Sequence, residues 1–407
     1  MTPTSLTQAG RRPDDRAEFT ATRFWRLMPA GMRRRWWLFR VFDLLARHWP
    51  LARRRRHGVL VVRMDGIGDM VLFRGSLDHY AEALGVGHDD ITVLGCDSWG
   101  PIADHVFDGY RVITINEHRY AKRLLYRLRV SIMVRRLAPA VAVCDQHFRR
   151  AMMASSLVWV SGAPRTVMSV LYVSEPTRSE YGWYLSQAET IVDTGLYPTH
   201  EVVRHAHFVS ALAGRCIAPS PPRIDWPKRP SPAEPGATYV VLNPGSNEYG
   251  RRWPLGRYAA ITEKLLDEDY RVVFVGAPGE APDPAVFGPL SERSNVIDLT
   301  GRTSVPELMD VMKNAAGVVT NDTGPAHLAI ALGTPTVVIG GGGHFGCFVP
   351  YPEGVAPATA RFVHHPMDCY HCFWRCHLRE KKADSFPCVA AVSEQQVWGA
   401  LGDLLGN

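Results

Sequence analysis

Short apolar runs alternate with stretches of helical periodicity along most of the 407-residue chain. A short run of apolar, β-branched residues is typical of a strand buried on both faces. Strands that alternate with helices predict a parallel, doubly wound sheet. The expected strands are 59–62, 91–94, 112–115, 141–143, 239–242, 271–275, 317–320 and 336–339. The expected helices are 122–137, 258–268, 305–313 and 326–332, with a further helical pattern through Leu77, Tyr80 and Leu84.

The alternating pattern occurs twice and is interrupted once. Residues 216–236 hold seven prolines, which predicts an extended linker, because proline lacks the backbone donor that helices and sheets need. We therefore expect an α/β protein with two Rossmann-like, doubly wound domains that face a ligand cleft. Residues 58–215 would form the N-terminal domain and residues 237–407 the C-terminal domain, while residues 1–57 would form a basic amphipathic arm.

The charge is unevenly distributed and changes the picture of the arm. Residues 1–57 contain 14 arginines, no lysine and four acids, a balance of +10, whereas the rest of the chain has a balance of −4. Overall, 46% of the residues are hydrophobic and 21% are charged. These proportions exclude a mostly disordered chain, a collagen-like fibre and a polytopic membrane protein. No run of 18 apolar residues occurs, and residues 1–20 lack the apolar segment of a secretory signal. We expect a cytoplasmic protein.

Within the arm, apolar residues recur with helical spacing between arginines. Basic residues beside a face of Trp, Phe and Leu are typical of a helix that lies in an anionic membrane interface. We therefore expect a peripheral protein on the cytoplasmic face of the inner membrane, with no nucleic-acid partner. The alternative is a helix whose apolar stripe packs on the protein's own body. The stripe comprises Leu38, Phe42, Leu45 and Trp49, with Trp37, Val41 and Leu44 beside it.

The strongest motif is VVTNDTGPAHLAIALGTPTVVIG, residues 318–340. A strand is followed by the turn NDTGP, and Pro325 suits the first turn of the next helix. Asp322 and Thr323 are residue types that cap helices, and Gly324 allows a ligand to approach the backbone closely. The amide groups and dipole at such a helix start form an anion site suited to a diphosphate. His327, one turn further on, could donate to a phosphate oxygen, although an ordinary strand–turn–helix remains the alternative.

Two further loops follow strands in the C-terminal half. In VVLNPGSNEYGRRWP, Asn243 and Gly245 lie where open sheets bind ligands, and Arg251 with Arg252 could neutralise a leaving diphosphate. In FVGAPGE, Glu280 could accept hydrogen bonds from the hydroxyls of a ribose, or it could be a solvated loop acid.

The loop RMDGIGDM after the first strand has two glycines but neither a dinucleotide-binding nor an NTP-binding pattern. It places Asp65 and Asp69 beside the expected cleft. A carboxylate there could act as general base on an acceptor hydroxyl, although Asp69 could instead cap the following helix.

Four cysteines crowd into residues 364–388, interleaved with histidines. The spacing of Cys369, Cys372, Cys376 and Cys388, with a CxxC start, suits a tetrahedral zinc site. An iron–sulfur cluster has similar ligands, and reduced thiols or disulfides that pack a loop are the third possibility. If metal binds, we expect a structural clip.

Six segments in this order resemble glycosyltransferase family 9, the heptosyltransferases of the lipopolysaccharide inner core. They are RMDGIGDMVL, HEVVRHAHFVSAL, LNPGSNEYGRRWP, VGAPGE, DLTGRTSVPELMDVM and NDTGPAHLAIALGTP. The resemblance covers residues 58–405. It implies a GT-B fold and an inverting transfer that requires no metal cofactor, typically from an ADP-linked heptose. The acceptor would be lipid-linked lipopolysaccharide or another cell-surface glycan.

By position, Asp69 matches the family's catalytic base, and Arg251 stands where relatives often have a lysine near the donor phosphates. Glu280 matches an acid at the nucleotide ribose, while Asp322, Thr323, Gly324 and His327 match the diphosphate and sugar loop. Two positions depart from the family's pattern. Gly75 stands where members usually have a proline, and Asp65 is an additional acid; both lie on the acceptor side. A transferase acting on a soluble or protein acceptor, or a non-catalytic sugar-nucleotide-binding scaffold, remains an alternative.

Overall fold

We describe the fold from a computed structural model, which describes residues 32–51, 55–172, 178–233 and 238–406. The chain forms two compact units. The first contains residues up to 66, 76–196 and 202–219, and the second contains residues 67–75, 197–201 and 220 onward. Between 216 and 233 the described residues form neither helix nor strand, as expected for the proline-rich segment. Residues 1–31 of the expected arm lie outside the described part of the chain.

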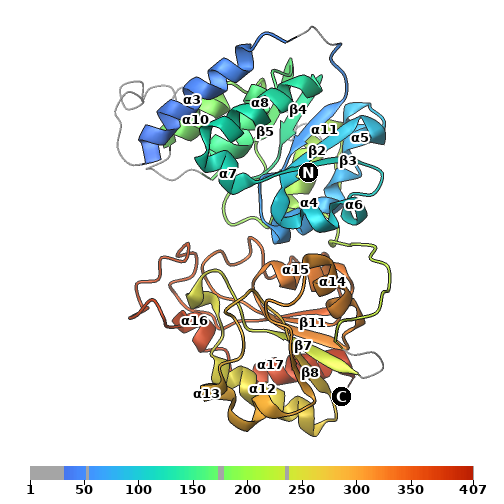
Figure 1. The fold of residues 1–407 in the computed structure, drawn as a ribbon, viewed down its shortest axis with the longest axis vertical. Helices are drawn as coiled ribbons and strands as arrows, with labels where there is room; N and C mark the ends of the chain where they lie inside the picture. Colours follow the sequence, from blue (N-terminus) through green and yellow to red (C-terminus); the bar gives the residue numbers. More distant parts are fainter. Residues whose placement is uncertain (1–31, 52–54, 173–177, 234–237, 407) are drawn as a thin grey trace. The chain divides into compact units, whose positions relative to one another are not determined.

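Each unit contains one parallel six-stranded sheet, and both sheets have the same strand order. The first sheet runs β3-β2-β1-β4-β5-β6, and the second runs β12-β11-β10-β7-β8-β9. Numbered within its own unit, each sheet has the order 3-2-1-4-5-6 of doubly wound nucleotide-binding folds. The expected doubly wound α/β architecture is therefore confirmed (Figure 1).

The strands are β1 (Val59–Val62), β2 (Ile91–Cys96), β3 (Arg111–Ile115), β4 (Val141–Cys144), β5 (Arg165–Ser169), β6 (Thr190–Val192), β7 (Tyr239–Asn243), β8 (Arg271–Phe274), β9 (Val296–Asp298), β10 (Gly317–Asn321), β11 (Thr336–Ile339) and β12 (Ala360–Val363). The α-helices are α3 (Met32–His48), α4 (Ile67–Leu77), α5 (Tyr80–Leu84), α6 (Ala103–Val106), α7 (Glu117–Lys122), α8 (Leu124–Leu137), α9 (Ser156–Val160), α10 (Arg178–Ser186), α11 (Glu201–Ala213), α12 (Leu255–Asp267), α13 (Pro284–Phe287), α14 (Val305–Asn314), α15 (Gly324–Ala331), α16 (Pro387–Ala390) and α17 (Glu394–Leu405).

All eight expected strands exist, and two of them, β1 and β11, have the expected bounds. Four strands lack the apolar run that would have predicted them: β5, β6, β9 and β12 are edge or near-edge strands with polar residues. The helix expected over 122–137 is α8, which begins two residues later because Arg123 adopts an extended conformation; the short helix α7 before Arg123 was not expected.

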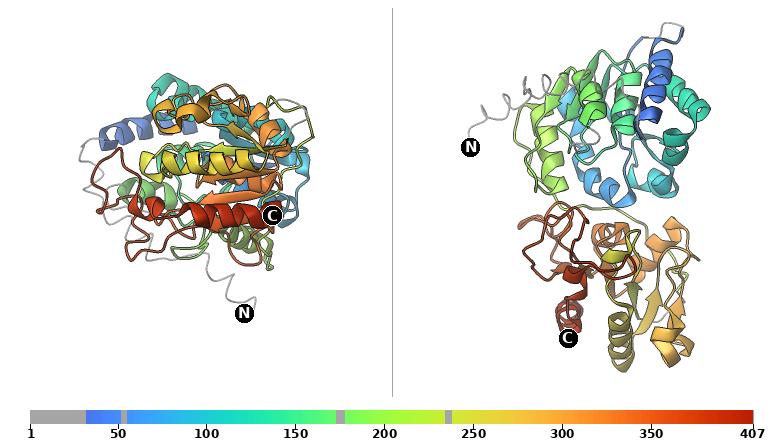
Figure 2. Two further views of the ribbon diagram at one scale, coloured as in Figure 1. Left: turned by 90° about the horizontal axis from the view of Figure 1, so that it is seen from below. Right: turned by 90° about the vertical axis from the view of Figure 1, so that its left-hand side faces the viewer.

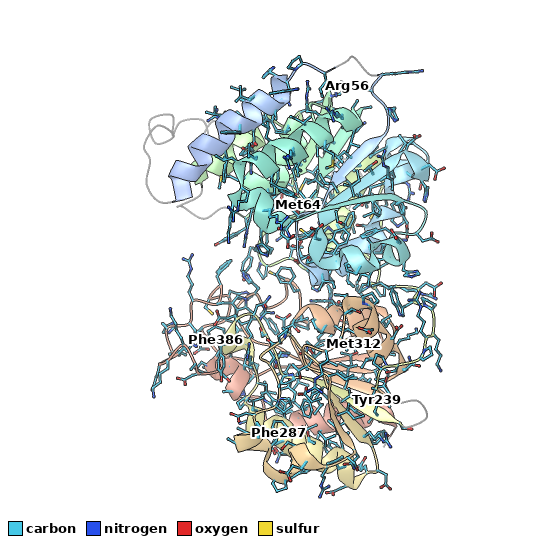
Figure 3. All side chains as sticks on the ribbon, viewed as in Figure 1. Arg56, Met64, Tyr239, Phe287, Met312 and Phe386 are labelled. Atoms are coloured by element: carbon cyan, nitrogen blue, oxygen red, sulfur yellow. The ribbon has the colours of Figure 1, made fainter. Side chains whose placement is uncertain are left out.

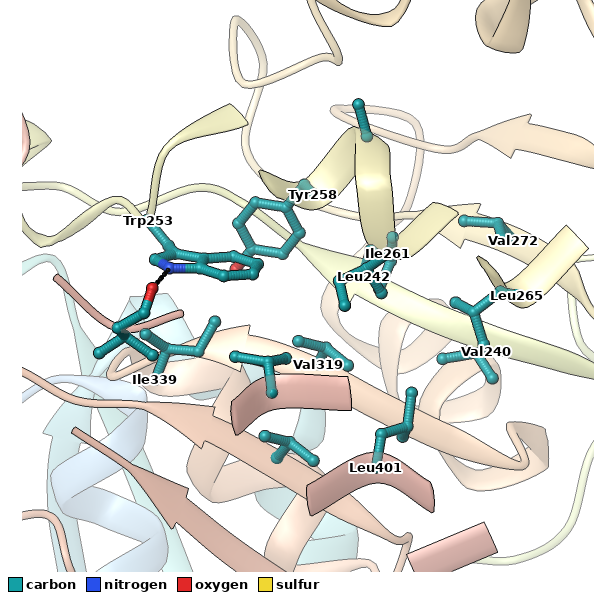
Figure 4. Packing of buried hydrophobic residues seen from close by; sticks show 14 of the residues in the cluster. Val240, Leu242, Trp253, Tyr258, Ile261, Leu265, Val272, Val319, Ile339 and Leu401 are labelled. Carbon is teal, nitrogen blue, oxygen red and sulfur yellow. Dashed lines mark hydrogen bonds between the residues drawn. The ribbon is translucent and has the colours of Figure 1, made fainter. Parts of the chain in front are cut away.

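Helices cover both faces of the second sheet. On one face, α12 and α17 pack around Trp253, whose indole Nε1 donates to the carbonyl of Val392 at 2.9 Å (Figure 4). Figure 2 shows α12 in yellow and α17 in red on this side of the sheet. On the other face lie α14 and α15. Figure 3 labels Met312 of α14 and Phe287 of α13, which are buried on opposite sides of the sheet. Burial on both faces explains why the central strands consist almost entirely of apolar residues.

The helix α3 of the expected arm is part of the first unit. It packs on α8 and α9 through Phe39, Asp43 and Ala46, which are buried and recur with helical spacing. Of the expected stripe, Leu45 and Trp49 lie on the opposite face together with the neighbouring Val41 and Leu44, all 38–53% exposed, whereas Phe42 is half-buried. The helix therefore packs on the body, but through another face than the stripe. The side chains of residues 32–38 lie outside the described part of the structure.

A buried ion pair attaches α3 to the unit. The guanidinium of Arg127 on α8 donates to both carboxylate oxygens of Asp43 at 2.7 and 2.6 Å, and Ser156 and Tyr184 donate to the same carboxylate at 2.6 and 2.8 Å. Burial by itself lowers the pKa of Arg127, but Tyr120 and Asp43 outweigh burial and raise that pKa above its usual value. Arg127 therefore remains charged, and the residue that balances this buried charge, Asp43, belongs to α3.

Removing the partner should destabilise the fold. Asp43→Ala leaves Arg127 buried without its counter-charge, so we expect the free energy of unfolding to fall by about 3–5 kcal/mol. The control is Glu82→Ala, which breaks the ion pair with Arg215, whose side chains are 66% and 50% exposed. An exposed pair contributes at most about 1 kcal/mol. Urea unfolding of the full chain measures both, and an equal loss in the two variants would contradict the anchoring role of Asp43.

Candidate active site

The strand order brings two predicted loops together. In the second sheet β7 and β10 are neighbours, with Asn243 paired in register with Thr320. The order of the strands reverses at this pair, and ligands of doubly wound sheets bind outside the carboxyl ends of such strands. The loops that follow β7 and β10 are NPGS and NDTGP, the two motifs predicted to bind the donor. The amide of Asn243 joins them, donating to the Thr320 hydroxyl at 3.2 Å.

A cavity of about 330 Å³ lies at this edge of the sheet. Its wall contains six of the predicted site residues: Asn243, Gly245, Arg251, Glu280, Thr323 and Gly324. Ser246, Asn247, Thr303, Ser304 and Ile67 also line it. A cavity with many polar backbone and side-chain groups, one cation and one carboxylate suits a charged, hydroxyl-rich ligand such as a sugar nucleotide.

Glu280 is held in place at the cavity by two contacts. One carboxylate oxygen accepts from the amide of Ala277 at 2.8 Å, and the other pairs with Arg252 at 3.0 Å. A Cβ atom on Gly245 would lie 1.9 Å from Glu280 Oε2, so only glycine fits beside the carboxylate. Arg252 also donates twice to the carbonyl of Ser246, at 3.0 and 2.8 Å. The sequence predicted that Arg252 neutralises a leaving diphosphate, whereas in the structure Arg252 joins the Glu280 carboxylate to the NPGS loop.

Arg251 lines the cavity and is held by Asp322. Its guanidinium lies 3.1 Å from the Asp322 carboxylate and also donates to the Asp322 carbonyl. Asp322 itself is buried and is not among the residues that line the cavity. The residues Thr323 and Gly324 thus face the ligand space, while Asp322 fixes the cation beside them.

His327 also lies away from the cavity wall. It is buried, and its Nδ1 atom is 2.8 Å from the hydroxyl of Tyr351, whose ring stacks on the imidazole. Burial and the nearby charge of Arg251 lower the pKa of His327 to about 3. The imidazole is therefore neutral at physiological pH. Its predicted contact with a phosphate oxygen stays a prediction.

Asn321 was missed as a functional residue. Its amide donates to the carbonyls of Pro244 and Gly245 at 2.8 and 3.2 Å, and its oxygen accepts from the Trp253 amide at 3.0 Å. The side chain thereby fixes the shape of the NPGS loop. The sequence offered only a turn-type residue at this position, because the partners of Asn321 are distant in the chain.

The start of α14 was also missed at the cavity. Thr303, Ser304 and Val305 line it, so α14 and α15 both direct their N-terminal amides towards the cavity region, which favours an anion. Ser304 and Glu307 form a capping box. The sequence located the helix itself, because the helix expected over 305–313 begins at the same residue as α14, but it gave no sign that this start lies at the cavity.

Asp69 lies in the first turn of α4 and is half-buried. The N-cap of α4 is Gly66, so Asp69 is not the capping residue, which removes one alternative to a catalytic role. Ile67, two residues earlier, lines the cavity, and residues 67–75 belong to the same compact unit as the donor-side loops.

Asp65 has a structural explanation. Its carboxylate pairs with the buried guanidinium of Arg63, which also donates to Asp145 at 2.5 Å. Asp145 in turn lies 2.8 Å from Nδ1 of His205 in α11. Burial by itself raises the pKa of Asp145, but Arg63 and His205 outweigh it and hold that pKa well below its usual range. Asp65 is therefore the outer member of a buried charge network that fixes the start of the loop.

The cysteine-rich segment packs on the second sheet. The amide of Gly342 donates to the Sγ atom of Cys388 at 3.4 Å. Burial raises the pKa of this thiol; the Gly342 hydrogen bond opposes the shift, and the neighbouring cysteines 369, 372 and 376 add to it. Among the described residues, no group of three or more His, Cys, Asp or Glu side chains is arranged to hold a metal ion. A structural zinc at this cluster stays a prediction.

Comparisons with known proteins agree with this geometry. Residues 199–358 match the model of glycosyltransferase family 9 (heptosyltransferase). The lipooligosaccharide heptosyltransferase 2 of Haemophilus influenzae is 34% identical over 103 residues, which is 24% of this chain and 30% of that protein. The chain thus matches less than a third of the length of this curated relative.

Solved structures resemble nearly the whole fold. The family 9 glycosyltransferase from Veillonella parvula has a TM-score of 0.65 at 19% identity and covers 87% of this chain and 99% of its own. The Escherichia coli heptosyltransferase WaaC, solved with ADP-2-deoxy-2-fluoro heptose, has a TM-score of 0.56 at 18% identity and covers 76% and 93%. The expected GT-B fold is confirmed. The family match also confirms the expected resemblance: residues 199–358, which contain the motifs predicted to bind the donor, are similar to glycosyltransferase family 9 (heptosyltransferase).

Proposed function

We propose that this protein is an inverting glycosyltransferase that transfers a heptose from an ADP-linked donor to a hydroxyl group of a lipopolysaccharide acceptor. One observation carries the proposal: the cavity at the carboxyl edge of β7 and β10 brings together a cation, a carboxylate and two helix N-termini. This combination matches the diphosphate and ribose of a nucleotide-sugar. The family match and the WaaC structure with an ADP-heptose analogue support the choice of donor.

The donor would be oriented by groups that are already held in place. Glu280, fixed by Arg252, accepts hydrogen bonds from the ribose hydroxyls. The diphosphate lies against Arg251 and the amides at the start of α15, where the helix dipole and the guanidinium stabilise the charge that grows on the leaving group. These cationic groups do the work of a metal ion, so the proposed transfer requires no metal cofactor.

The acceptor would be activated by Asp69. Its carboxylate takes the proton of the acceptor hydroxyl while that oxygen attacks the anomeric carbon from the face opposite the diphosphate. The C–O bond to the acceptor forms as the bond to the diphosphate breaks, and the configuration of the anomeric carbon inverts.

The outer face of α3 supports a location at a membrane surface. Val41, Leu44, Leu45 and Trp49 are exposed on this face. The guanidinium groups of Arg40 and Arg47 instead pack on the rings of Trp183 and Trp159 in the first unit. An exposed apolar face on an arginine-rich helix suits the anionic surface of a bilayer, where a lipid-linked acceptor would be available. In the part of the chain that the structure describes, no helix is long and apolar enough to cross a membrane.

Asp69→Asn should abolish transfer and leave donor binding intact. We expect transfer from ADP-heptose to heptose-deficient lipopolysaccharide to fall by about 10²–10⁴-fold, the usual contribution of a general base. The affinity for ADP, measured by calorimetry, should be unchanged. Asp89→Asn, in an exposed turn of the first unit, is the control and should retain parental activity. Transfer at the parental rate by Asp69→Asn would contradict the assigned base.

Glu280→Gln should weaken binding of ADP but not of inorganic pyrophosphate. Hydrogen bonds to a charged acceptor contribute about 1.5–3 kcal/mol, so a loss of about tenfold or more is expected for ADP. Pyrophosphate has no ribose and serves as the internal comparison, and Glu263→Gln on the exposed side of α12 serves as the control variant. Equal losses for ADP and pyrophosphate would show that Glu280 acts on the phosphates or on the fold.

The membrane proposal predicts that Leu45→Glu combined with Trp49→Glu reduces binding to vesicles of phosphatidylglycerol and phosphatidylcholine. The two charges replace apolar surface that would enter the interface, and a loss of about tenfold or more is expected. Val286→Glu, which also charges an exposed apolar residue but in the second unit, should bind as the parent does. Flotation of the full chain measures all three, and parental binding by the double variant would refute this docking face.

A further inference from the structure

The cysteine-rich segment lies directly on the loop of glycines that follows β11. The amides of His371 and Phe373 donate to the carbonyls of Gly342 and Gly343 at 2.6 and 2.9 Å. A Cβ atom on Gly343 would lie 2.1 Å from Cδ2 of Trp374. The aromatic ring therefore takes the space that a side chain at this position would need, and the two segments fit each other closely.

The backbone of this segment adopts a conformation that aromatic residues rarely accept. Phe373 and Trp374 have φ angles of 55° and 60°, in the left-handed region that costs about 1 kcal/mol or more for residues other than glycine. The hydrogen bonds to the glycine loop and the stacking of Trp374 on Phe386, with ring centroids 5.4 Å apart, offset that cost. The structure thus holds the Trp374 ring in one defined place.

The ring of Trp374 faces Arg251. The Cζ atom of the Arg251 guanidinium lies 4.9 Å from the centroid of the ring, within the range of a cation–π interaction. On another side, the same guanidinium pairs with Asp322. Arg251 lines the donor cavity, whereas Trp374 is not among the lining residues. Trp374 therefore contacts the cavity only through the side chain of Arg251.

His344, the imidazole beside Trp374, adds no charge next to Arg251 at neutral pH. His344, which packs edge-on to Trp374 with centroids 6.2 Å apart, is mostly buried, and burial together with the charge of Arg251 lowers the pKa of His344 to about 4. The imidazole is therefore neutral at physiological pH. A planar guanidinium can stack on an indole and pair with a carboxylate at the same time, which an ammonium group cannot do equally well.

We infer that Trp374 is a positioning residue for the donor phosphates: its ring, supplied by the cysteine-rich segment, holds the guanidinium of Arg251 in the orientation that binds a diphosphate. The inference rests on the proposed function for the identity of the ligand. It gives the cysteine-rich segment a task in donor binding that does not depend on whether its thiols bind a metal. It also explains why an arginine suits position 251.

A double-substitution cycle tests the inference with ADP as the probe. Trp374→Leu keeps an apolar side chain but removes the π face, and Arg251→Lys keeps the charge but removes the planar fork. We expect each to weaken ADP binding by about fivefold, in the range of a partly desolvated cation–π contact. The double variant should be no weaker than the worse single variant, because both changes remove the same interaction. Trp374→Phe should retain most of the affinity.

The control variant is Trp398→Leu, which removes the ring that Lys264 contacts at 5.6 Å. Neither residue lines the cavity, so this variant should bind ADP as the parent does. Losses that multiply in the double variant would overturn the inference, and so would a loss in Trp374→Phe equal to that in Trp374→Leu. Circular dichroism identifies a variant that fails to fold, and Trp374→Met, which also lacks an aromatic ring, replaces Trp374→Leu in the cycle if the leucine variant does not fold.

A ligand-free measurement separates this inference from the proposed function. The parent, Trp374→Leu, Arg251→Lys and the double variant are compared by their thermal unfolding midpoints without ADP. If the parent does not bind ADP, the proposed donor is wrong, but a smaller-than-additive loss of thermal stability would still support the contact between residues 251 and 374. If the losses of thermal stability and the losses of ADP affinity are both additive in the double variant, the positioning role of Trp374 is refuted, whereas the proposed function is not affected.

Discussion

The parallel pairing of β7 with β10 is the constraint on which the candidate site depends. It places the carboxyl ends of two strands that are about 75 residues apart in the chain side by side, so the loops NPGS and NDTGP emerge together. The side chains of Asn243 and Asn321 then connect these loops with hydrogen bonds to buried partners. Because those amides are satisfied within the protein, the conformation of the two loops is set by contacts within the protein itself.

Charge at the site is arranged in fixed pairs rather than as mobile side chains. Arg251 is held by Asp322 and Trp374, and Glu280 is held by Arg252 and a backbone amide. Groups already oriented lose little conformational entropy when a ligand arrives, and a preoriented cation stabilises a leaving diphosphate most effectively. The neighbouring imidazoles of His327 and His344 have lowered pKa values, so pH changes near neutrality do not add charge at this corner.

The sequence was sufficient for the architecture and for most of the donor loops, because both depend on local pattern. Buried parallel strands such as β1 and β11 are continuous apolar runs, and turn residues mark the loops after β7 and β10. Edge strands β9 and β12 carry polar residues and gave no such signal. The roles of Asn321 and Arg252, and the contact of Trp374 with Arg251, depend on partners far away in the chain. The sequence also did not predict the face by which α3 packs. An aspartate in an amphipathic helix is normally assigned to the solvent side, and Asp43 is buried only because Arg127 pairs with it.

The attachment of α3 through Asp43 and Arg127 has a consequence for the energetics of meeting a lipid surface. Many amphipathic segments are unfolded in water and become helical only at the bilayer, so part of their binding energy is consumed in ordering the backbone. Here the helix is already folded on the protein, with its apolar residues facing outward. A bilayer that contacts this face would encounter a preformed surface whose direction relative to the first sheet is fixed. Adsorption would then orient the whole first unit and not merely tether it.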